Sequence, residues 1–238
     1  MKKTLLLLCA SVMYVASMGQ SADEILQKYV DAAGGTANAG KVKTMKLTAS
    51  VSVQGMEFPM TQQIISGRGV RTDVDVMSTS VTMSYKDGKG WKVNQFAGAP
   101  DPTPMDAGEL ADHEEQISVV SPLFDSKKNG ETLSLAGEET VNGVKTWKLK
   151  AVTKSGREFF YYVSSVNYDL VKLVGKRSMN GSDVEVETVY EDYRNVEGLR
   201  LPFSITNSTG GATYQAVKVD KYEINVPVDE KSFDMPAK

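Results

Sequence analysis

One short acidic run has the residue types of a metal site or a catalytic centre. It consists of Asp112, His113, Glu114 and Glu115, and His113 is the only histidine in the 238 residues. Carboxylates and an imidazole can bind a metal ion or act as general acid and base. Four consecutive helical residues point in different directions, however, so they cannot converge on one ion. We therefore predict a solvated helix face, with no metal site and no catalytic residue here.

The sequence signals for a glycosidase acid pair and for a phosphate-binding loop are equally weak. Glu185 and Glu187 alternate with Val184 and Val186, which places both acids on the solvated face of a strand and not in a glycosidase pair. The glycine clusters at 67–69 and 87–90 lack the strand-to-helix context of a phosphate-binding loop, so we interpret them as turns. The sequence predicts no enzyme and no cofactor.

The first nineteen residues have the layout of a secretory signal peptide. Lys2 and Lys3 precede an apolar run that ends at Val15, and small residues follow up to Gly19. We predict cleavage after Gly19. The only cysteine, Cys9, lies inside this segment and follows a leucine, so we interpret it as part of the apolar run and not as a lipid attachment point.

The remaining chain, 20–238, is predicted to be one mildly acidic domain without a membrane-spanning segment. Removal of two lysines lowers the basic count from 27 to 25 against 30 acids, which changes the formal charge from −3 to −5. This charge, without any basic run, argues against nucleic acid or an anionic membrane face as a partner. Without cysteine, burial alone must stabilise the fold.

Hydrophobic periodicity predicts a mainly β (α+β) protein. A capping box at Ser21 and Glu24 begins an amphipathic helix, which Gly34 and Gly35 end. Period-two alternation then runs through 45–93 and 133–219, divided by turn pairs such as Asn142-Gly143. We count about eleven strands, spaced as in a closed or partly closed antiparallel sheet.

An irregular insertion, 97–128, separates the two series of strands. We expect Thr103 to cap a helix with Pro104 in its first turn, and Pro122 to end the helical segment. Leu110, Ile117 and Val120 form a weak apolar face. A curved sheet that such helices cover as a lid can keep an apolar cavity.

Several motifs, in order along the chain, resemble the LolA/LolB-like superfamily of periplasmic lipoprotein carriers. They are residues 22–26, 87–91, 142–149, 161–163, 170–172, 191–202, 222–225 and 233–236. The resemblance implies a half-open antiparallel β-barrel with a helical lid that holds acyl chains. It also implies an arginine that latches the lid from the end of an early strand. Arg68 is the nearest counterpart, although Gly69 replaces the family's proline, and Arg71 is the competing candidate.

The leading hypothesis is a periplasmic, non-enzymatic carrier or sensor for lipid or lipoprotein acyl chains, which acts in lipoprotein sorting to the outer membrane. Its partners would be lipoprotein-handling proteins of the inner or outer membrane. The residues expected to line the cavity are Met83, Tyr85, Trp91, Phe96, Leu123, Phe124, Trp147 and Tyr161. Two alternatives remain: a fully packed module that docks a partner protein, and a secreted hydrolase built on His113.

Overall fold

Antiparallel strands dominate the computed structural model, which describes residues 20–77, 79–95, 98–179 and 181–236. The strands are β1 (Thr44–Val53), β2 (Met56–Ile65), β3 (Gly69–Val76), β4 (Thr79–Lys86), β5 (Lys89–Asn94), β6 (Ala99–Pro104), β7 (Thr132–Val141), β8 (Val144–Val152), β9 (Glu158–Ser164), β10 (Leu170–Met179), β11 (Ser182–Val196), β12 (Leu199–Thr209) and β13 (Ala212–Ile224).

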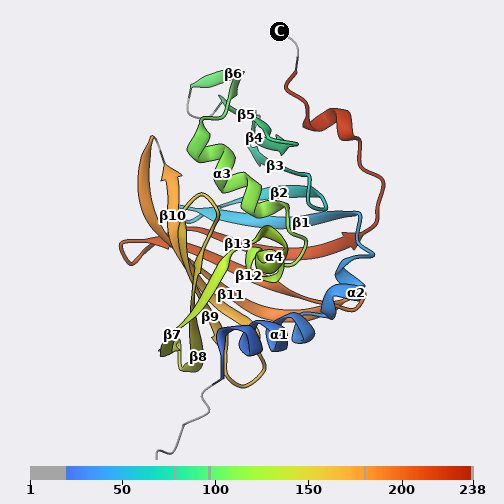
Figure 1. Cartoon of the computed structure of the whole chain (residues 1–238). Helices are drawn as coiled ribbons and strands as arrows, with labels where there is room; N and C mark the ends of the chain where they lie inside the picture. Colours follow the sequence, from blue (N-terminus) through green and yellow to red (C-terminus); the bar gives the residue numbers. More distant parts are fainter. Residues whose placement is uncertain (1–19, 78, 96–97, 180, 237–238) are drawn as a thin grey trace, which may run out of the picture.

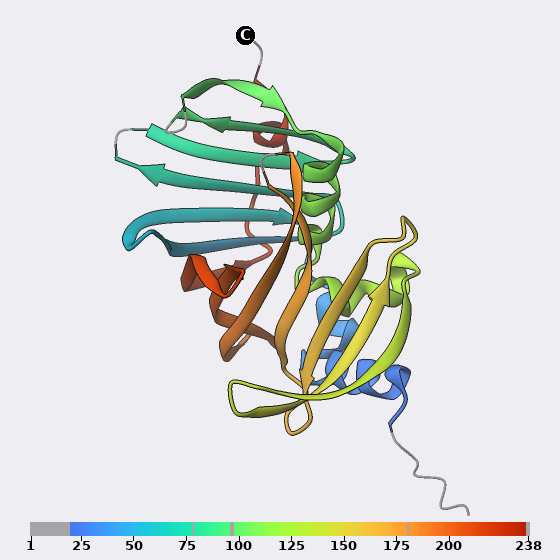
Figure 2. The ribbon, with the colours of Figure 1, turned by 90° about the vertical axis from the view of Figure 1, so that its left-hand side faces the viewer.

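One sheet contains strands from both halves of the chain. Its order is β6-β5-β4-β3-β2-β1-β13-β12-β11-β10-β9-β8-β7, and within the described residues it has thirteen strands where the sequence predicted about eleven. The sheet is strongly curved, and its end strands β6 and β7 remain apart (Figure 2). The structure therefore confirms the predicted class, a mainly β protein whose antiparallel sheet is open and accompanied by helices.

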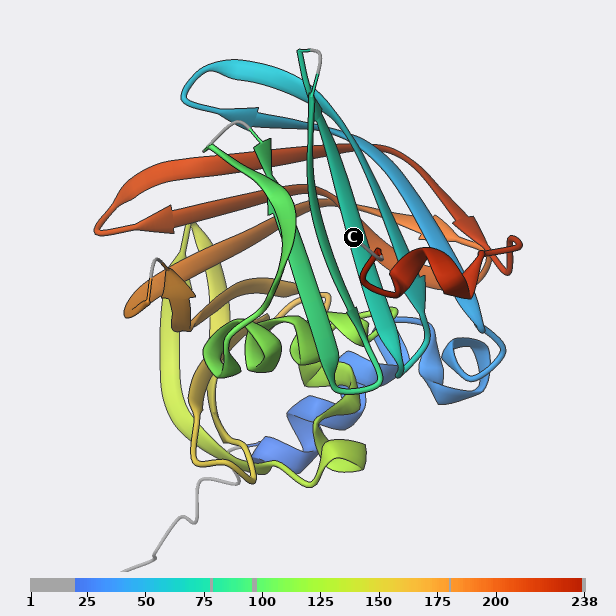
Figure 3. The same cartoon turned by 90° about the horizontal axis from the view of Figure 1, so that it is seen from above.

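Short helices accompany this sheet. They are α1 (Ala22–Ala32), α2 (Gly35–Ala39), α3 (Ala107–Glu114), the 3-10 turn η2 (Glu115–Ile117) and α4 (Pro122–Asn129), with a further 3-10 turn, η3 (Glu230–Phe233), near the C-terminus. Seen from above, α1, α3 and α4 lie within the hollow side of the sheet (Figure 3). Residues 105–130, which contain α3, η2 and α4, are called the lid below.

Local sequence signals explain the first helix and the hairpins. Ser21 Oγ accepts from Glu24 N at 3.2 Å, and Glu24 Oε2 accepts from Ser21 N at 2.9 Å, which confirms the predicted capping box. The predicted turn between β7 and β8 has φ of 49° at Asn142 and 81° at Gly143. A two-residue turn of this type needs positive φ at both positions, which asparagine tolerates and glycine adopts freely.

The start of the lid differs from the prediction. Thr103 and Pro104 do not begin a helix, because they belong to the edge strand β6, where a proline removes no hydrogen bond that a further strand would need. The helix α3 begins after Asp106, whose carboxylate accepts from Glu109 N at 2.9 Å in a second capping box. Pro122 likewise does not end a helix, since it occupies the first turn of α4 after the cap Ser121.

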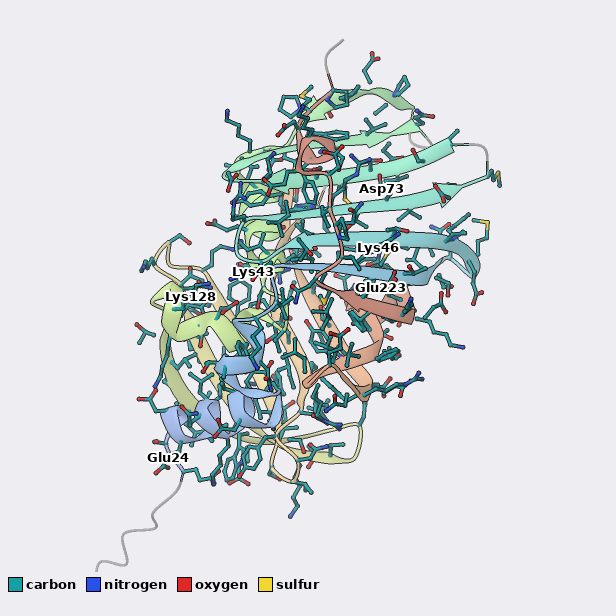
Figure 4. The ribbon with its side chains drawn as sticks, turned by 90° about the vertical axis from the view of Figure 1, so that its right-hand side faces the viewer. Glu24, Lys43, Lys46, Asp73, Lys128 and Glu223 are labelled. Carbon is teal, nitrogen blue, oxygen red and sulfur yellow. The ribbon has the colours of Figure 1, made fainter. Side chains whose placement is uncertain are left out.

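The C-terminal segment crosses the convex face, on the opposite side of the sheet from α3 (Figure 1). Trp91 Nε1 and Ser84 Oγ both donate to the carbonyl oxygen of Phe233, at 2.8 and 2.9 Å. The rest of this convex face carries charged side chains, among them Lys46, Asp73 and Glu223 (Figure 4). A polar convex face and an apolar concave face are what the period-two alternation of the strands predicts.

Candidate functional site

The concave face of β1–β4 is apolar where it meets the lid. Met45, Ile64, Val70 and Tyr85 are directly opposite one another across four strands, so their side chains share this face. All four are buried, in one cluster with Val119 of the lid. Leu110 and Ile117 of the lid pack against the same cluster. The lid therefore covers this half of the sheet with its own apolar side chains.

The second half of the sheet, β8–β10, presents a matching apolar face. Leu149 is opposite Tyr161, which is opposite Leu173, and all three are buried. Leu123 of α4 is fully buried in the same cluster, and Phe124 packs against it. The ring of Phe124 meets that of Tyr29 of α1 edge-on at 6.5 Å. The lid thus lies between the two halves of the sheet (Figure 2).

Lid side chains occupy the hollow that the sequence analysis expected to be free. Two of the pockets among the described residues lie at the margins of α3. One, of about 730 Å³, lies between the β4–β5 turn, Met105 and Leu110 of the lid, and the C-terminal segment. The other, of about 540 Å³, lies between α3 and β9–β11. The structure is therefore a closed arrangement in which the protein covers its own apolar face.

The predicted lining residues differ in where the structure places them. Tyr85, Trp147 and Tyr161 belong to the buried clusters of the concave face or pack against them, as do Leu123 and Phe124 from the lid. Met83 shares the face of Tyr85 and is half-buried.

The prediction for Trp91 is wrong, because Trp91 is paired with Ser84 and not with Tyr85, so it lies on the convex face under the C-terminal segment. Phe96 lies outside the described residues.

Polar side chains also share the concave face. Gln62 Nε2 donates to Thr72 Oγ1 at 3.0 Å on one half of the sheet. On the other half, Asn207 Oδ1 accepts from Thr188 at 2.7 Å, and its amide donates to Gln215 at 2.8 Å. The face that the lid covers is therefore apolar with hydrogen-bonded polar groups at its border, as in an amphiphile site.

Two acids of the lid form ion pairs with two arginines of the sheet. Arg157 contacts Asp112 Oδ1 through Nη2 and Glu115 Oε1 through Nη1, the latter at 3.0 Å. Arg177 contacts Glu115 Oε2 and lies 3.6 Å from Asp112. Asp112 Oδ2 also accepts from Ser178 N at 2.7 Å. We call these four side chains the lid ion cluster.

The lid ion cluster corrects the prediction of a solvated helix face. Asp112 is only 7% exposed, and the Glu115 side chain is 13% exposed. Burial raises the pKa of Glu115, an effect that the charges of Arg177 and Arg157 oppose. Burial also raises the pKa of nearby Glu131 to about 7, together with the charges of Glu115 and Asp125. Several ionisable side chains therefore lie at the border of the lid, where they are partly removed from water.

Among the described residues, the side-chain hydrogen bonds and ion pairs of both predicted latch residues are with groups outside the lid. Arg68 pairs with Asp87 at 2.8 Å and with Glu230 at 3.2 Å. Arg71 pairs with Asp73 and donates to the carbonyl oxygen of Ser232, so both arginines tie the C-terminal segment to the sheet. The turn after β2 does bind the lid, but through the backbone N–H of Gly67.

Other tethers attach the lid at several points. Gly67 N donates to Ile117 O at 3.0 Å, and Lys92 of β5 pairs with Glu109. Buried Tyr29 and Ser121 share a hydrogen bond of 2.6 Å between their hydroxyls. Together with the lid ion cluster, these contacts hold the lid to both halves of the sheet. The ion pairs of Arg157 and Arg177 with the lid were not predicted from the sequence.

His113 gives little support to the hydrolase alternative. Its Nδ1 lies 2.8 Å from Glu109 O in its own helix, and burial lowers its pKa. In the part of the chain that the structure describes, no three His, Asp or Glu side chains are placed to hold a metal ion. Within those same ranges, no helix combines the length and apolarity needed to cross a membrane.

Comparison with known proteins identifies the fold. No protein-family model matches the chain, and no curated protein matches it. A LolA superfamily protein from Nitrosomonas europaea superposes with a TM-score of 0.59 at 12% identity, over 91% of this chain and 98% of the other. A putative outer membrane lipoprotein-sorting protein domain from Vibrio parahaemolyticus gives 0.60 at 9% identity, over 90% and 97%.

A third similar structure, a DUF1329 family protein from Desulfovibrio piger, has a TM-score of 0.57 at 12% identity, over 90% of this chain and 97% of the other. At such identities the likeness concerns the fold alone. The chain therefore has the LolA-like fold that the sequence resemblance predicted. The residues of its site have to be argued from its own geometry.

Proposed function

We propose that the protein is a non-enzymatic periplasmic carrier or sensor that binds acyl chains of lipids or lipoproteins on its concave face, after cleavage of residues 1–19. The observation that supports the proposal is an apolar concave face covered by the apolar side chains of a separate lid. The LolA-like fold supports it, because one similar structure is named as a lipoprotein-sorting domain.

Binding would exchange lid contacts for ligand contacts. Burial of an acyl chain contributes roughly 0.8 kcal/mol per methylene, so a dozen methylenes contribute roughly 10 kcal/mol. Against this stands the loss of the lid's contacts, including fully buried Leu123 and half-buried Phe124. A partner protein that binds the open lid would shift this balance, and this would provide the release that lipoprotein sorting to the outer membrane requires.

A second candidate function is a module that docks a partner protein with its lid permanently closed. The same covered concave face favours it, because side chains already fill the space between lid and sheet. The two candidates differ in one property, which is whether the lid has to move.

A disulfide lock on the lid tests this property. The chain after residue 19 contains no cysteine. A Cβ atom at Gly108 of α3 would lie 2.9 Å from Ser178 Cβ of β10. A disulfide needs a Cβ separation of about 3.5–4.5 Å, so a shift of α3 by roughly 1 Å suffices for Gly108→Cys with Ser178→Cys.

Binding of a fluorescent fatty-acid probe to delipidated protein is the measurement. We expect the reduced double variant to bind the probe as wild type does, and the oxidised form to lose binding. The single variant Gly108→Cys, treated with the same oxidant, controls for the substitution. Equal binding by the oxidised and reduced forms, or no binding by wild type, would refute the proposal and favour the docking module.

A further inference from the structure

Two arginines converge on one aromatic ring at the border of the lid. Arg157 precedes β9 and Arg177 lies on β10, and their guanidinium carbons are 5.3 and 5.2 Å from the centre of the Phe159 ring. Phe159 is 1% exposed and lies against Gly175, where a Cβ atom would approach its ring to 2.3 Å. The ring is therefore held in place, and it positions two cations side by side.

The two positive charges are compensated by the lid. Among the described residues, Arg157 and Arg177 form ion pairs only with Asp112 and Glu115 of the lid. Lifting the lid would remove both carboxylates together. Two guanidinium groups, whose side chains are only 25% and 20% exposed, would then lack a counter-charge. These exposures are those with the lid closed. Once the lid is lifted, two adjacent positive charges without a counter-charge repel each other, so the open form should attract an anion.

Three observations indicate donors available to such an anion. Arg157 Nη1 is buried and has no aligned hydrogen-bond acceptor among the described residues, although it lies 3.0 Å from Glu115. Burial raises the pKa of both Tyr161 and Tyr190, an effect that the charge of Arg177 opposes, so both hydroxyls keep their protons and can donate. The pocket of about 540 Å³ has Asp112 and Arg157 in its wall, which opens the cluster to solvent.

We infer that Arg157 and Arg177 are a binding site for the phosphate or carboxylate headgroup of an amphiphile, and that Asp112 and Glu115 occupy this site when the lid is closed. The inference rests on the proposed function and specifies its ligand class, an anionic amphiphile. The chains of the ligand replace the apolar side chains of the lid, while its headgroup replaces the lid's carboxylates. Planar guanidinium groups suit this exchange, because they bind carboxylate and phosphate alike with two parallel hydrogen bonds.

Two probes of equal chain length isolate the headgroup: a lysophosphatidylglycerol, which is anionic, and the corresponding monoacylglycerol, which has no charge. Both are titrated into delipidated protein below their micelle concentrations. We expect the anionic probe to bind about tenfold more tightly, the effect of one well-formed charged hydrogen-bond pair. Inorganic phosphate alone is expected to bind at least a hundredfold more weakly than the anionic probe, because it buries no methylenes.

A charge-neutral double variant tests the assignment. Arg177→Gln with Glu115→Gln removes one charge of each sign, so it avoids an unpaired buried ion, and it should reduce the preference to about twofold or less. Lys148→Gln with Glu139→Gln makes the same change in an ion pair of 3.3 Å outside the lid ion cluster and should retain the preference. Circular dichroism checks that both variants fold.

The outcomes separate this inference from the proposed function. Equal binding of the two probes to wild type, or an unchanged preference in Arg177→Gln with Glu115→Gln, would overturn the headgroup site while leaving acyl-chain binding intact. Failure of both probes to bind would overturn both. Phosphate binding as tight as that of the anionic probe would overturn the assignment to a lipid and indicate a site for a free anion.

Discussion

Truncation of Leu123 should loosen the lid more than it harms the sheet. Leu123 is fully buried in the cluster that α1, α4 and β8–β10 share. Leu123→Ala removes three carbon atoms, which is about 2.4 kcal/mol of burial at roughly 0.8 kcal/mol per carbon. The cavity that remains adds about 1 kcal/mol, so the free energy of unfolding should fall by about 3–4 kcal/mol.

Leu47→Ala is the matched control. Leu47 is 5% exposed and lies in a third cluster, formed by residues of β1, β2, β12 and β13 without any lid residue. Its truncation should cost a similar free energy of unfolding, measured by urea titration with tryptophan fluorescence. Only Leu123 loses its contacts when the lid opens, so only Leu123→Ala should lower the cost of opening.

The functional measurement is binding of the fluorescent fatty-acid probe. If acyl chains compete with the lid for the concave face, Leu123→Ala should bind the probe roughly tenfold to a hundredfold more tightly than wild type, because 1.4 kcal/mol corresponds to a factor of ten. Leu47→Ala should not gain affinity. Amide hydrogen exchange in α4 should accelerate in Leu123→Ala alone. Weaker probe binding in Leu123→Ala than in Leu47→Ala would refute the competition between lid and ligand.

Three further predictions concern single positions. Gly175→Ala should destabilise the protein by about 1–3 kcal/mol in urea titration, because its Cβ atom would overlap the Phe159 ring; unchanged stability would contradict the packing described for that ring. Glu131 has a pKa of about 7 in the folded protein against 4.5 ordinarily, so the folded state retains a proton that the unfolded chain releases. The free energy of unfolding should therefore decrease as the pH rises from about 4.5 to about 7, and Glu131→Gln should remove this part of the slope; an identical pH profile in the variant would show that the carboxyl is not perturbed. Trp91→Phe removes the donor to Phe233 O, so it should cost about 1 kcal/mol in urea titration and speed proteolysis of the C-terminal segment; resistance equal to that of wild type would show that this bond does not hold the segment.

Much of the fold could be predicted because its signals are local. Turn pairs such as Asn142-Gly143 fix where hairpins reverse, and the alternation in β1 fixes which side chains are buried. The edge strand β6 was missed because it contains three prolines and has no alternating hydrophobic pattern. Its position follows from pairing with β5, which is a tertiary contact and not a property of its own residues.

The error at Trp91 was avoidable from the turn alone. Asp87-Gly88 is a two-residue turn, with φ of 50° and 82°, which pairs Lys86 with Lys89. Counting outward from this pair places Tyr85 opposite Gly90 and Ser84 opposite Trp91. Because opposite residues share a face, Trp91 belongs with Ser84 and cannot line the side that Tyr85 occupies. The strand register that a turn fixes is therefore better evidence of which face of the sheet a side chain occupies than the apolarity of that side chain.

Helix geometry and strand alternation could have predicted part of the lid ion cluster. The helical geometry that excludes a metal site for four consecutive residues also places Asp112 and Glu115, three apart, on one side of the chain. Two acids on one side indicate a shared cationic partner. Arg177 lies two residues beyond Gly175 and four beyond Leu173 on β10, so the sequence places it on the concave face. The pairing of Arg177 with the acids could not be predicted, because Arg177 lies 62 residues from Glu115 along the chain. Only the curvature of the sheet brings β10 to the lid.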